Sequence, residues 1–115
     1  MFTGYDNDYI KVNREPCYSS LCIHAGLLTM PWGPERLRDI TAESLSMFLD
    51  TPPEILIIGT GRTTAFPDNA IMQQLRDQHI GLECMDSRSA ARTYNILLAE
   101  GRNVSAAMLL PGSRK

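Results

Sequence analysis

The sequence has no run of about 18 consecutive apolar residues, the length that a transmembrane helix requires, so we expect no membrane span. It also has no excess of positive charge, because 13 acidic side chains stand against 11 basic ones and the formal net charge is -2. A domain that binds nucleic acid normally carries a basic patch or stripe. We therefore expect no nucleic-acid partner.

Cysteine and histidine are scarce. Cys17, Cys22 and Cys84 are odd in number and follow no ligand spacing, and His24 and His79 lie far apart. A zinc site requires closely spaced pairs of such residues, so the sequence predicts no metal site. The N-terminal residues also lack the basic and then apolar layout of a secretory signal. These absences favour a reduced, cytoplasmic protein.

The strongest positive signal is the stretch from Ile55 to Ile58, which consists of four large apolar residues. Such a run predicts a strand that is covered on both faces, as in a parallel sheet. Gly59 and Gly61 end the run at once. In α/β folds the carboxyl end of a buried strand is the usual location of a ligand site. The sequence therefore predicts where a site lies, but it indicates no particular reaction.

Two more strands and two connecting helices are predicted after this strand. Asp68 is expected to cap the first helix, and Asp86 or Ser87 the second. The strands are expected at 82–85 and 104–110. Because amphipathic helices between strands usually connect parallel neighbours, we predict that all three strands are mutually parallel in one sheet.

The first half of the chain predicts an antiparallel hairpin and one helix. Residues 9–13 and 20–24 alternate between apolar and polar side chains, as two paired short strands do. Thr41 is placed to cap a helix whose apolar stripe includes Phe48.

Together these elements predict an α/β fold in a single three-layer domain. We expect it to span residues 1–115, with a mostly parallel sheet, a β-α-β-α-β C-terminal half and an N-terminal β-hairpin. We expect residues 1–8 and 111–115 to be frayed termini.

A candidate anion site is predicted where the glycine turn and the third helix begin. Both segments should open on the same edge of the sheet. Guanidinium groups and free backbone N–H donors at that edge could bind a phosphate or a carboxylate. The candidate residues are Gly59, Thr60, Gly61, Arg62, Asp86, Ser87, Arg88 and Arg92.

The alternative interpretation of these residues is structural, and we favour it. The glycines would supply the unusual backbone angles of a tight turn. Asp86 would cap the helix and pair with one arginine, because structural ion-pair networks resemble sites. Gly59-Thr60-Gly61 is also an incomplete dinucleotide fingerprint, since Thr64 stands where the third glycine belongs.

Four short motifs follow one another along the second half of the chain. They are Ile-Ile-Gly-Thr-Gly at 57–61, Gly-Leu-Glu-Cys-Met-Asp at 81–86, Ala-Arg-Thr-Tyr-Asn-Ile-Leu at 91–97 and Glu-Gly-Arg-Asn-Val at 100–104. In this order and spacing they resemble one small α/β family, and the resemblance covers nearly the whole chain. The family contains uncharacterised bacterial and archaeal proteins, the mitochondrial complex I assembly factor 3 and an adipogenesis-associated Mth-like protein.

The resemblance implies a compact α/β fold, no known cofactor and no established enzymatic activity. The mitochondrial members look like assembly factors that act through protein contacts. Related members often carry a cysteine before Arg-Thr-Tyr-Asn, where this chain has Ser89-Ala90-Ala91. The chain also lacks the N-terminal targeting extension of the mitochondrial members, and we expect a free-standing prokaryotic version.

Two functions follow from these observations. The first is a non-enzymatic binding or assembly module with a protein partner, linked to respiratory complex assembly by the resemblance. The alternative is a protein or enzyme that binds a small anionic ligand in a cleft between the 59–61 turn and the 86–92 helix start. A flat apolar patch would favour the first, and a concave pocket with converging arginines the second. A homo-oligomer is a further expectation.

Overall fold

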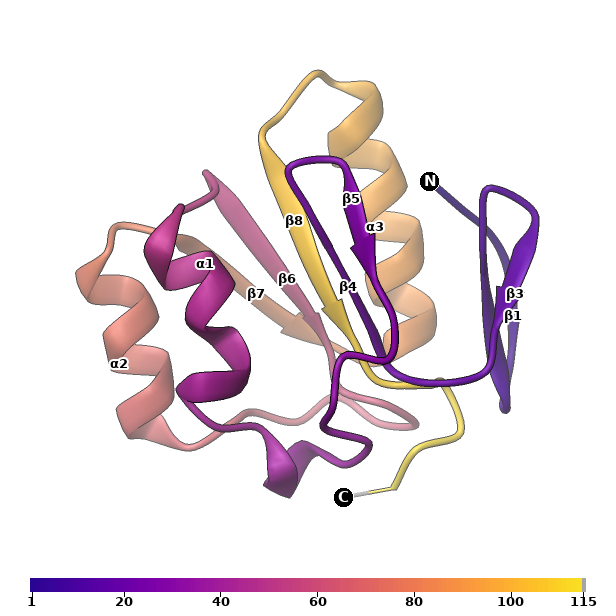
Figure 1. The fold of residues 1–115 in the computed structure, drawn as a ribbon, viewed down its shortest axis with the longest axis horizontal. Coiled ribbons are helices and arrows are strands. Elements are labelled where there is room, and N and C mark those ends of the chain that lie inside the picture. The colour runs from indigo at the N-terminus through magenta and orange to yellow at the C-terminus, as the bar shows by residue number, and fades with distance from the viewer. Residues whose placement is uncertain (115) are drawn as a thin grey trace.

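Strand β6 (Ile55–Gly59) lies inside a five-stranded sheet of the computed structural model, which describes residues 1–114 (Figure 1). β7 (Gly81–Met85) and β8 (Val104–Met108) flank it, and both run parallel to it. Every side chain from Leu56 to Ile58 is fully buried. The predicted parallel arrangement of these three strands is confirmed.

The sheet as a whole is mixed, so the prediction of a mostly parallel sheet is wrong. Its strand order is β5-β4-β8-β6-β7. β4 (Leu21–His24) runs antiparallel to β8, and β5 (Leu27–Thr29) runs antiparallel to β4. Ala25 and Gly26 connect β4 to β5 with φ angles of 52° and 77°. A two-residue turn with positive φ at both positions matches the twist of antiparallel strands.

The predicted hairpin between residues 9–13 and 20–24 is also wrong, because these segments lie in different sheets. β1 (Phe2–Asp6), β2 (Tyr9–Val12) and β3 (Glu15–Cys17) form a separate antiparallel sheet in that order. Alternation of apolar and polar residues predicts a strand and its buried face, but it does not identify the neighbouring strand.

Residues 1–8, where fraying stays a prediction, include strand β1. The Phe2 side chain is only 4% exposed. Its amide N–H donates to Asn95 Oδ1 at 2.9 Å, and its carbonyl accepts from Asn95 Nδ2 at 2.6 Å. A buried aromatic ring and a paired backbone therefore hold this end against the third helix.

The C-terminal segment is held as well. Pro111 is buried, and the Gly112 N–H donates to the Asn7 carbonyl at 2.8 Å. The Ser113 carbonyl accepts from the Arg62 N–H at 2.9 Å. Residues 111–113 therefore pair with other parts of the fold, fraying of 111–115 stays a prediction, and Lys115 lies outside the described residues.

Two helices cover one face of the five-stranded sheet (Figure 1). They are α1 (Ser46–Asp50), which follows the 3-10 turns η1 (Leu37–Asp39) and η2 (Glu43–Leu45), and α2 (Asn69–Asp77). Phe48 and Leu75 pack there against Leu56 and Ile58. Thr41 Oγ1 accepts from the Ser44 N–H at 3.2 Å, but the N-cap residue of η2 is Ala42 and that of α1 is Leu45, so the helix cap predicted at Thr41 is wrong.

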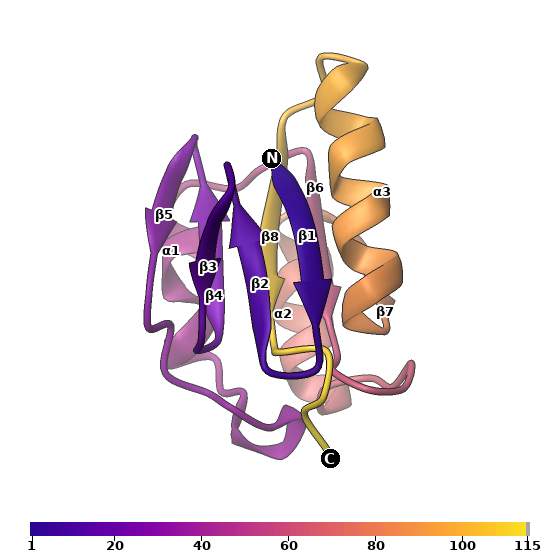
Figure 2. The ribbon, with the colours of Figure 1, turned by 90° about the vertical axis from the view of Figure 1, so that its right-hand side faces the viewer.

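The other face is covered by α3 (Ser87–Ala99) together with the three-stranded sheet (Figure 2). Ala90, Ala91 and Tyr94 of α3 pack against Ile57 and Ala106 in this second cluster. Asp86 caps α3 by accepting from the Ser89 N–H at 3.1 Å, as predicted. Because α3 starts directly after β7, its first turn lies at the carboxyl edge of the sheet.

Candidate functional site

The glycine turn after β6 is packed tightly against the rest of the protein. Gly61 has a φ of 96°, and a Cβ at this position would lie 2.5 Å from the Ser113 carbonyl oxygen. A Cβ at Gly59 would lie 2.8 Å from Met108 Sδ and 2.9 Å from Ser87 Oγ. Close packing within the protein therefore explains why glycine occupies both positions, without a ligand.

The backbone donors of this turn are occupied. An anion site would need free N–H groups that point into a cavity. Here the three amides of the turn donate to groups of the protein itself, and the turn therefore offers no free donor to an anion. The acceptors of Thr60, Gly61 and Arg62 are Met85 O, Ser87 Oγ and Ser113 O, at 2.8, 2.9 and 2.9 Å.

The N-terminus of α3 is likewise occupied, by the carboxylate of Asp86. Partial burial is the largest single influence and would raise the pKa of this carboxyl, but hydrogen bonds from Ser89 and Arg88 and the charge of Arg92 together lower the pKa. The Asp86 N–H donates to Thr64 Oγ1 at 3.1 Å. Since a negative charge already interacts with the helix dipole, a second anion is less favourable there.

Asp86 provides a test of this capping role. We expect Asp86→Ala to lower the free energy of unfolding by about 1 kcal/mol at neutral pH, because a cap is lost. The folded-state pKa of Asp86 lies below its unfolded value, so its stabilisation is present above the unfolded pKa and is lost as pH falls through the folded pKa.

The loss caused by Asp86→Ala should therefore shrink when urea denaturation is repeated below about pH 4. Asp86→Asn is the control, since asparagine caps without a titrating charge. Its stability relative to Asp86→Ala should not change with pH. A loss in Asp86→Ala that is the same at both pH values would contradict the ionised cap.

The two arginines of α3 face the three-stranded sheet. Arg88 Nη2 donates to Asn7 Oδ1 at 2.6 Å, and its guanidinium lies 5.9 Å from the centre of the Tyr5 ring. Arg92 Nη1 donates to the Tyr5 hydroxyl at 2.6 Å. Arg62 is exposed, and its side chain has no hydrogen bond or ion pair with any other described residue. Anion binding by these residues stays a prediction.

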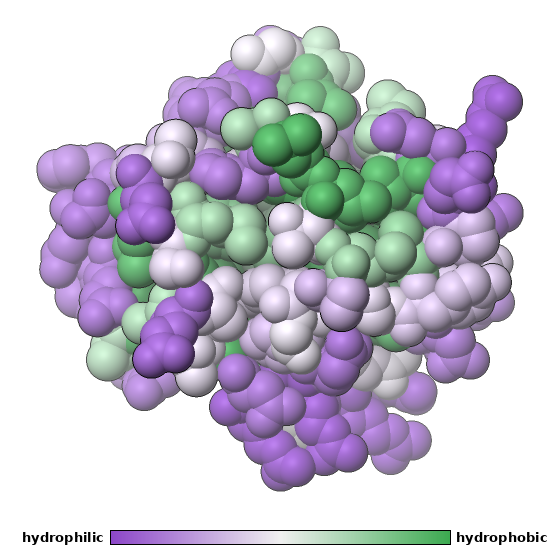
Figure 3. All heavy atoms as spheres, viewed as in Figure 1, coloured by the Kyte–Doolittle hydropathy of each residue, from purple (hydrophilic) through white to green (hydrophobic). Residues whose placement is uncertain are grey.

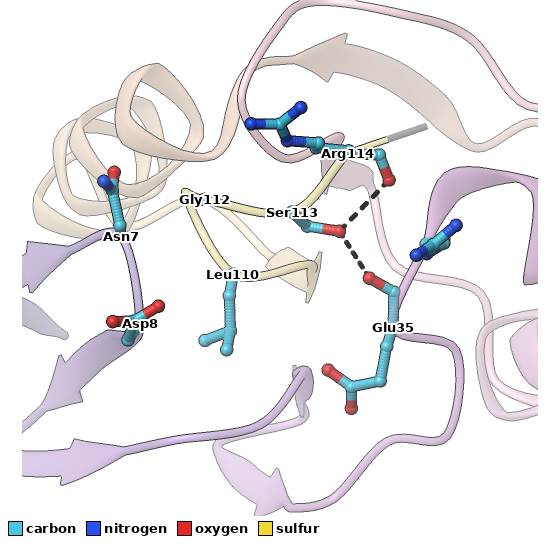
Figure 4. Close-up of a pocket in the computed structure, with 8 residues that line it drawn as sticks. Asn7, Asp8, Glu35, Leu110, Gly112, Ser113 and Arg114 are labelled. Atoms are coloured by element: carbon cyan, nitrogen blue, oxygen red, sulfur yellow. Dashed lines mark hydrogen bonds between the residues drawn. The ribbon is translucent and has the colours of Figure 1, made fainter.

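A pocket of about 340 Å³ opens beside the turn, and none of its lining residues belongs to the predicted site (Figure 4). Two carboxylates and two guanidinium groups line it, so neither sign of charge dominates. The lining comes from separate loops and the C-terminal segment, which share no spacing that a motif could reveal. These residues are Asn7, Asp8, Glu35, Arg36, Leu110, Gly112, Ser113 and Arg114.

A second feature, an exposed apolar surface, lies over the β4–β5 hairpin, where hydrophobic residues gather in Figure 3. Leu27, Leu28 and Met30 are 73%, 44% and 46% exposed. We call these three residues the hairpin surface. Single exposed apolar side chains are common, whereas neighbouring ones indicate a binding surface.

A groove of about 400 Å³ runs beside the hairpin surface. Leu28 belongs to both features, and the groove separates the hairpin from the three-stranded sheet and α3. Most of its side chains are apolar, with Glu15 and Asn13 as polar members. The lining residues are Met1, Val12, Asn13, Glu15, Ile23, Gly26, Leu28, Tyr94 and Leu98.

The Cys84 thiol and the His24 imidazole lie outside these features, and the contacts of both are explained by packing and hydrogen bonding within the fold. Burial raises the pKa of the Cys84 thiol to about 11, so the thiol is protonated at neutral pH and is a poor nucleophile. His24 Nδ1 lies 2.7 Å from the fully buried Ser105 Oγ, and the His24 ring packs edge-on against Phe48.

Among residues 1–114, the helices are all too short or too polar to span a lipid bilayer.

Comparison with known proteins identifies relatives over most of the chain. The sequence model of the family described as protein of unknown function (DUF498/DUF598) matches residues 2–109. The mouse NADH dehydrogenase [ubiquinone] 1 alpha subcomplex assembly factor 3 is 34% identical over 92 residues, which are 78% of this chain and 50% of that protein. The chain therefore spans about half the length of this curated relative.

Two bacterial proteins are also similar. The 13 kDa major membrane protein of Francisella tularensis subsp. holarctica is 36% identical over 73 residues, covering 64% of this chain and 59% of that protein. The solution structure of a Bordetella pertussis protein, described as a Mth938-like domain, is 34% identical with a TM-score of 0.81. The alignment with this structure covers 97% of this chain and 86% of that one.

Proposed function

The chain belongs to the family of proteins of unknown function DUF498/DUF598, and from this membership we propose that it is a protein-binding module that assists the assembly of a respiratory complex. The observation that carries the proposal is the similarity to relatives named as assembly factors of NADH dehydrogenase, at 34% identity in mouse and 35% in human. A location in the cytoplasm is part of this proposal.

The hairpin surface supports a protein partner. Leu27 exposes 73% of its surface to water although it lies in a regular strand. Burying apolar surface of this kind stabilises a complex by roughly 25 cal/mol for each Å² removed from water. Leu27 and Leu28 are successive strand residues, so they offer this apolar area on opposite faces of the sheet.

Affinity capture from the native cell tests the proposal. We expect tagged wild-type protein to co-purify with subunits of an NADH dehydrogenase, identified by mass spectrometry. A variant with Leu27→Lys and Met30→Lys should retain less than about one-tenth of that material, because charges at the centre of an interface cost more than about 1.4 kcal/mol.

The matched control for capture is Ile96→Lys, which places the same charge on an apolar α3 side chain that is 60% exposed. It should capture the partner as wild type does. If the hairpin variant retained its partners, or if wild type captured no subunit of such a complex, the proposal would be wrong.

A second candidate function, anion binding, rests on the exposed guanidinium of Arg62 at the carboxyl end of β6. An anion at a hundredfold excess over its Kd would stabilise the fold by about 2.7 kcal/mol, which a thermal scan detects. Replacing Arg62 and Arg88 with alanine should abolish the shift given by phosphate or carboxylates. An equal response of wild type and this double variant would remove the candidate.

A further inference from the structure

The two sheets end in four edge strands, β1, β3, β5 and β7, and one of them is unprotected. Proteins commonly place charges or prolines on edge strands to prevent pairing with another strand. β5, Leu27–Thr29, carries no charge and no proline. Furthermore, residues 16–34 contain no Asp, Glu, Lys or Arg. The acidic residues of the other three edge strands are Asp6, Glu15 and Glu83.

The backbone of β5 can accept another strand. The turn at Ala25 and Gly26 joins His24 to Leu27, and these two residues are partners in the β4–β5 register. The two residues that flank a two-residue turn form a hydrogen-bonded pair. Along the strands, hydrogen-bonded pairs then alternate with non-hydrogen-bonded pairs. Ile23 and Leu28 are therefore a non-hydrogen-bonded pair, and the N–H and C=O groups of Leu28 point away from β4.

The outer side of β5 is free within the described part of the chain. No strand pairs with β5 on that side, and no turn or side-chain hydrogen bond among residues 1–114 uses the backbone of Leu28. In Figure 2, β5 lies at the border of the ribbon. An incoming strand would therefore find both a donor and an acceptor at Leu28.

The groove beside the hairpin surface indicates which side chains that strand should carry. Leu28 lines the groove, so its side chain lies on the face of the sheet where the groove opens. Every second side chain of a strand added beside β5 would lie on that same face. Val12, Ile23 and Leu98 make the groove suitable for an apolar side chain. The Glu15 carboxylate is also part of the lining, and it has no ion pair among residues 1–114. A lysine or arginine would complement it.

We propose that β5 binds an extended segment of a partner protein by β-strand addition. One apolar side chain of the segment occupies the groove, and a basic side chain lies near Glu15. The inference rests on the proposed function and specifies how the partner is recognised.

A second copy of this chain fits the site less well. Its own hairpin, within residues 16–34, offers no lysine or arginine to Glu15. Moreover, contact between two strands of three residues is short compared with the roughly 1,200 Å² or more that stable interfaces bury.

Selection from a phage-displayed library of random heptapeptides on the purified chain tests the proposal. Enriched peptides should alternate apolar residues and carry a lysine or arginine. The best of them, made synthetically, should lose at least tenfold in affinity when the alternate amides that face β5 are N-methylated. N-methylation of the other amides should have a much smaller effect.

Variants of the chain localise the site. Leu28→Lys and Glu15→Arg should each weaken peptide binding at least tenfold, whereas Ile96→Lys should not, with unchanged melting temperatures as the check on folding. Lack of enrichment, acidic peptides or insensitivity to N-methylation would each overturn strand addition. If the wild-type chain self-associated and Leu28→Lys abolished the association, the proposal would also be overturned, because a second copy of this chain would then pair with β5.

Peptide binding to β5 and capture of a respiratory complex from cells can fail independently of each other. If cellular capture depends on Leu27 and Met30 while no peptide binds β5, the assembly role stands and strand addition is wrong. If peptides bind as expected while the captured material contains no subunit of a respiratory complex, the recognition mode stands and the assembly role is wrong.

Discussion

Replacing Ile57 with aspartate should leave no folded protein. The Ile57 side chain is fully buried in the middle of β6, with parallel strands paired on both sides. It packs there against Tyr94 and Met108, so no water could solvate a carboxylate. An unpaired buried charge costs several kcal/mol, on the order of the whole 5–15 kcal/mol stability of a small domain.

Circular dichroism and thermal melting of purified protein would show the effect. The control is Ile96→Asp, which makes the same change at a position on α3 that is 60% exposed. This control should remain folded and lose no more than about 1 kcal/mol. Soluble Ile57→Asp protein that melts cooperatively would show that β6 is not the centre of the fold.

Gly61→Ala should lower the free energy of unfolding by about 3 kcal/mol or more, near the upper end of single substitutions. Its φ of 96° is strained for any residue with a Cβ, at a cost of about 1–2 kcal/mol. In addition, the new Cβ would lie 2.5 Å from the backbone oxygen of Ser113. That oxygen accepts the Arg62 N–H, so it cannot move without breaking the link to the C-terminal segment.

Gly101→Ala separates the two effects. Gly101 has a φ of 77°, but a Cβ there would meet no atom within 4 Å. It should therefore show the backbone strain alone, and urea denaturation should find a clearly smaller loss than for Gly61→Ala. Equal losses at the two positions would mean that the contact with Ser113 is not a constraint on the turn.

The features that the sequence predicts correctly are local ones. The apolar run at 55–58 is a buried strand, and Asp68 and Asp86 cap their helices, because caps and periodicity depend on neighbouring residues. The family resemblance is confirmed by the match over residues 2–109. Strand partners were not predictable, since β3 and β5 have only three residues and show almost no pattern.

For the predicted site too, the sequence indicates which segments come together but not the contacts between distant residues. Gly61 and Ser87 do meet, through a hydrogen bond of 2.9 Å, as expected for two segments at one edge of the sheet. The sequence could not show that the donors of the turn are satisfied internally, because Ser113 belongs to a segment expected to be frayed. The hairpin surface was missed because the exposure of Leu27 depends on the position of β5 at the sheet edge.

The most direct test of the assembly role is the amount of assembled NADH dehydrogenase in cells that lack this chain. Native gels should show less assembled complex in these cells, and wild-type protein or Ile96→Lys should restore it. At equal protein levels, the variant with Leu27→Lys and Met30→Lys should not restore it. A normal amount of complex without the chain, or full restoration by the hairpin variant, would contradict the account.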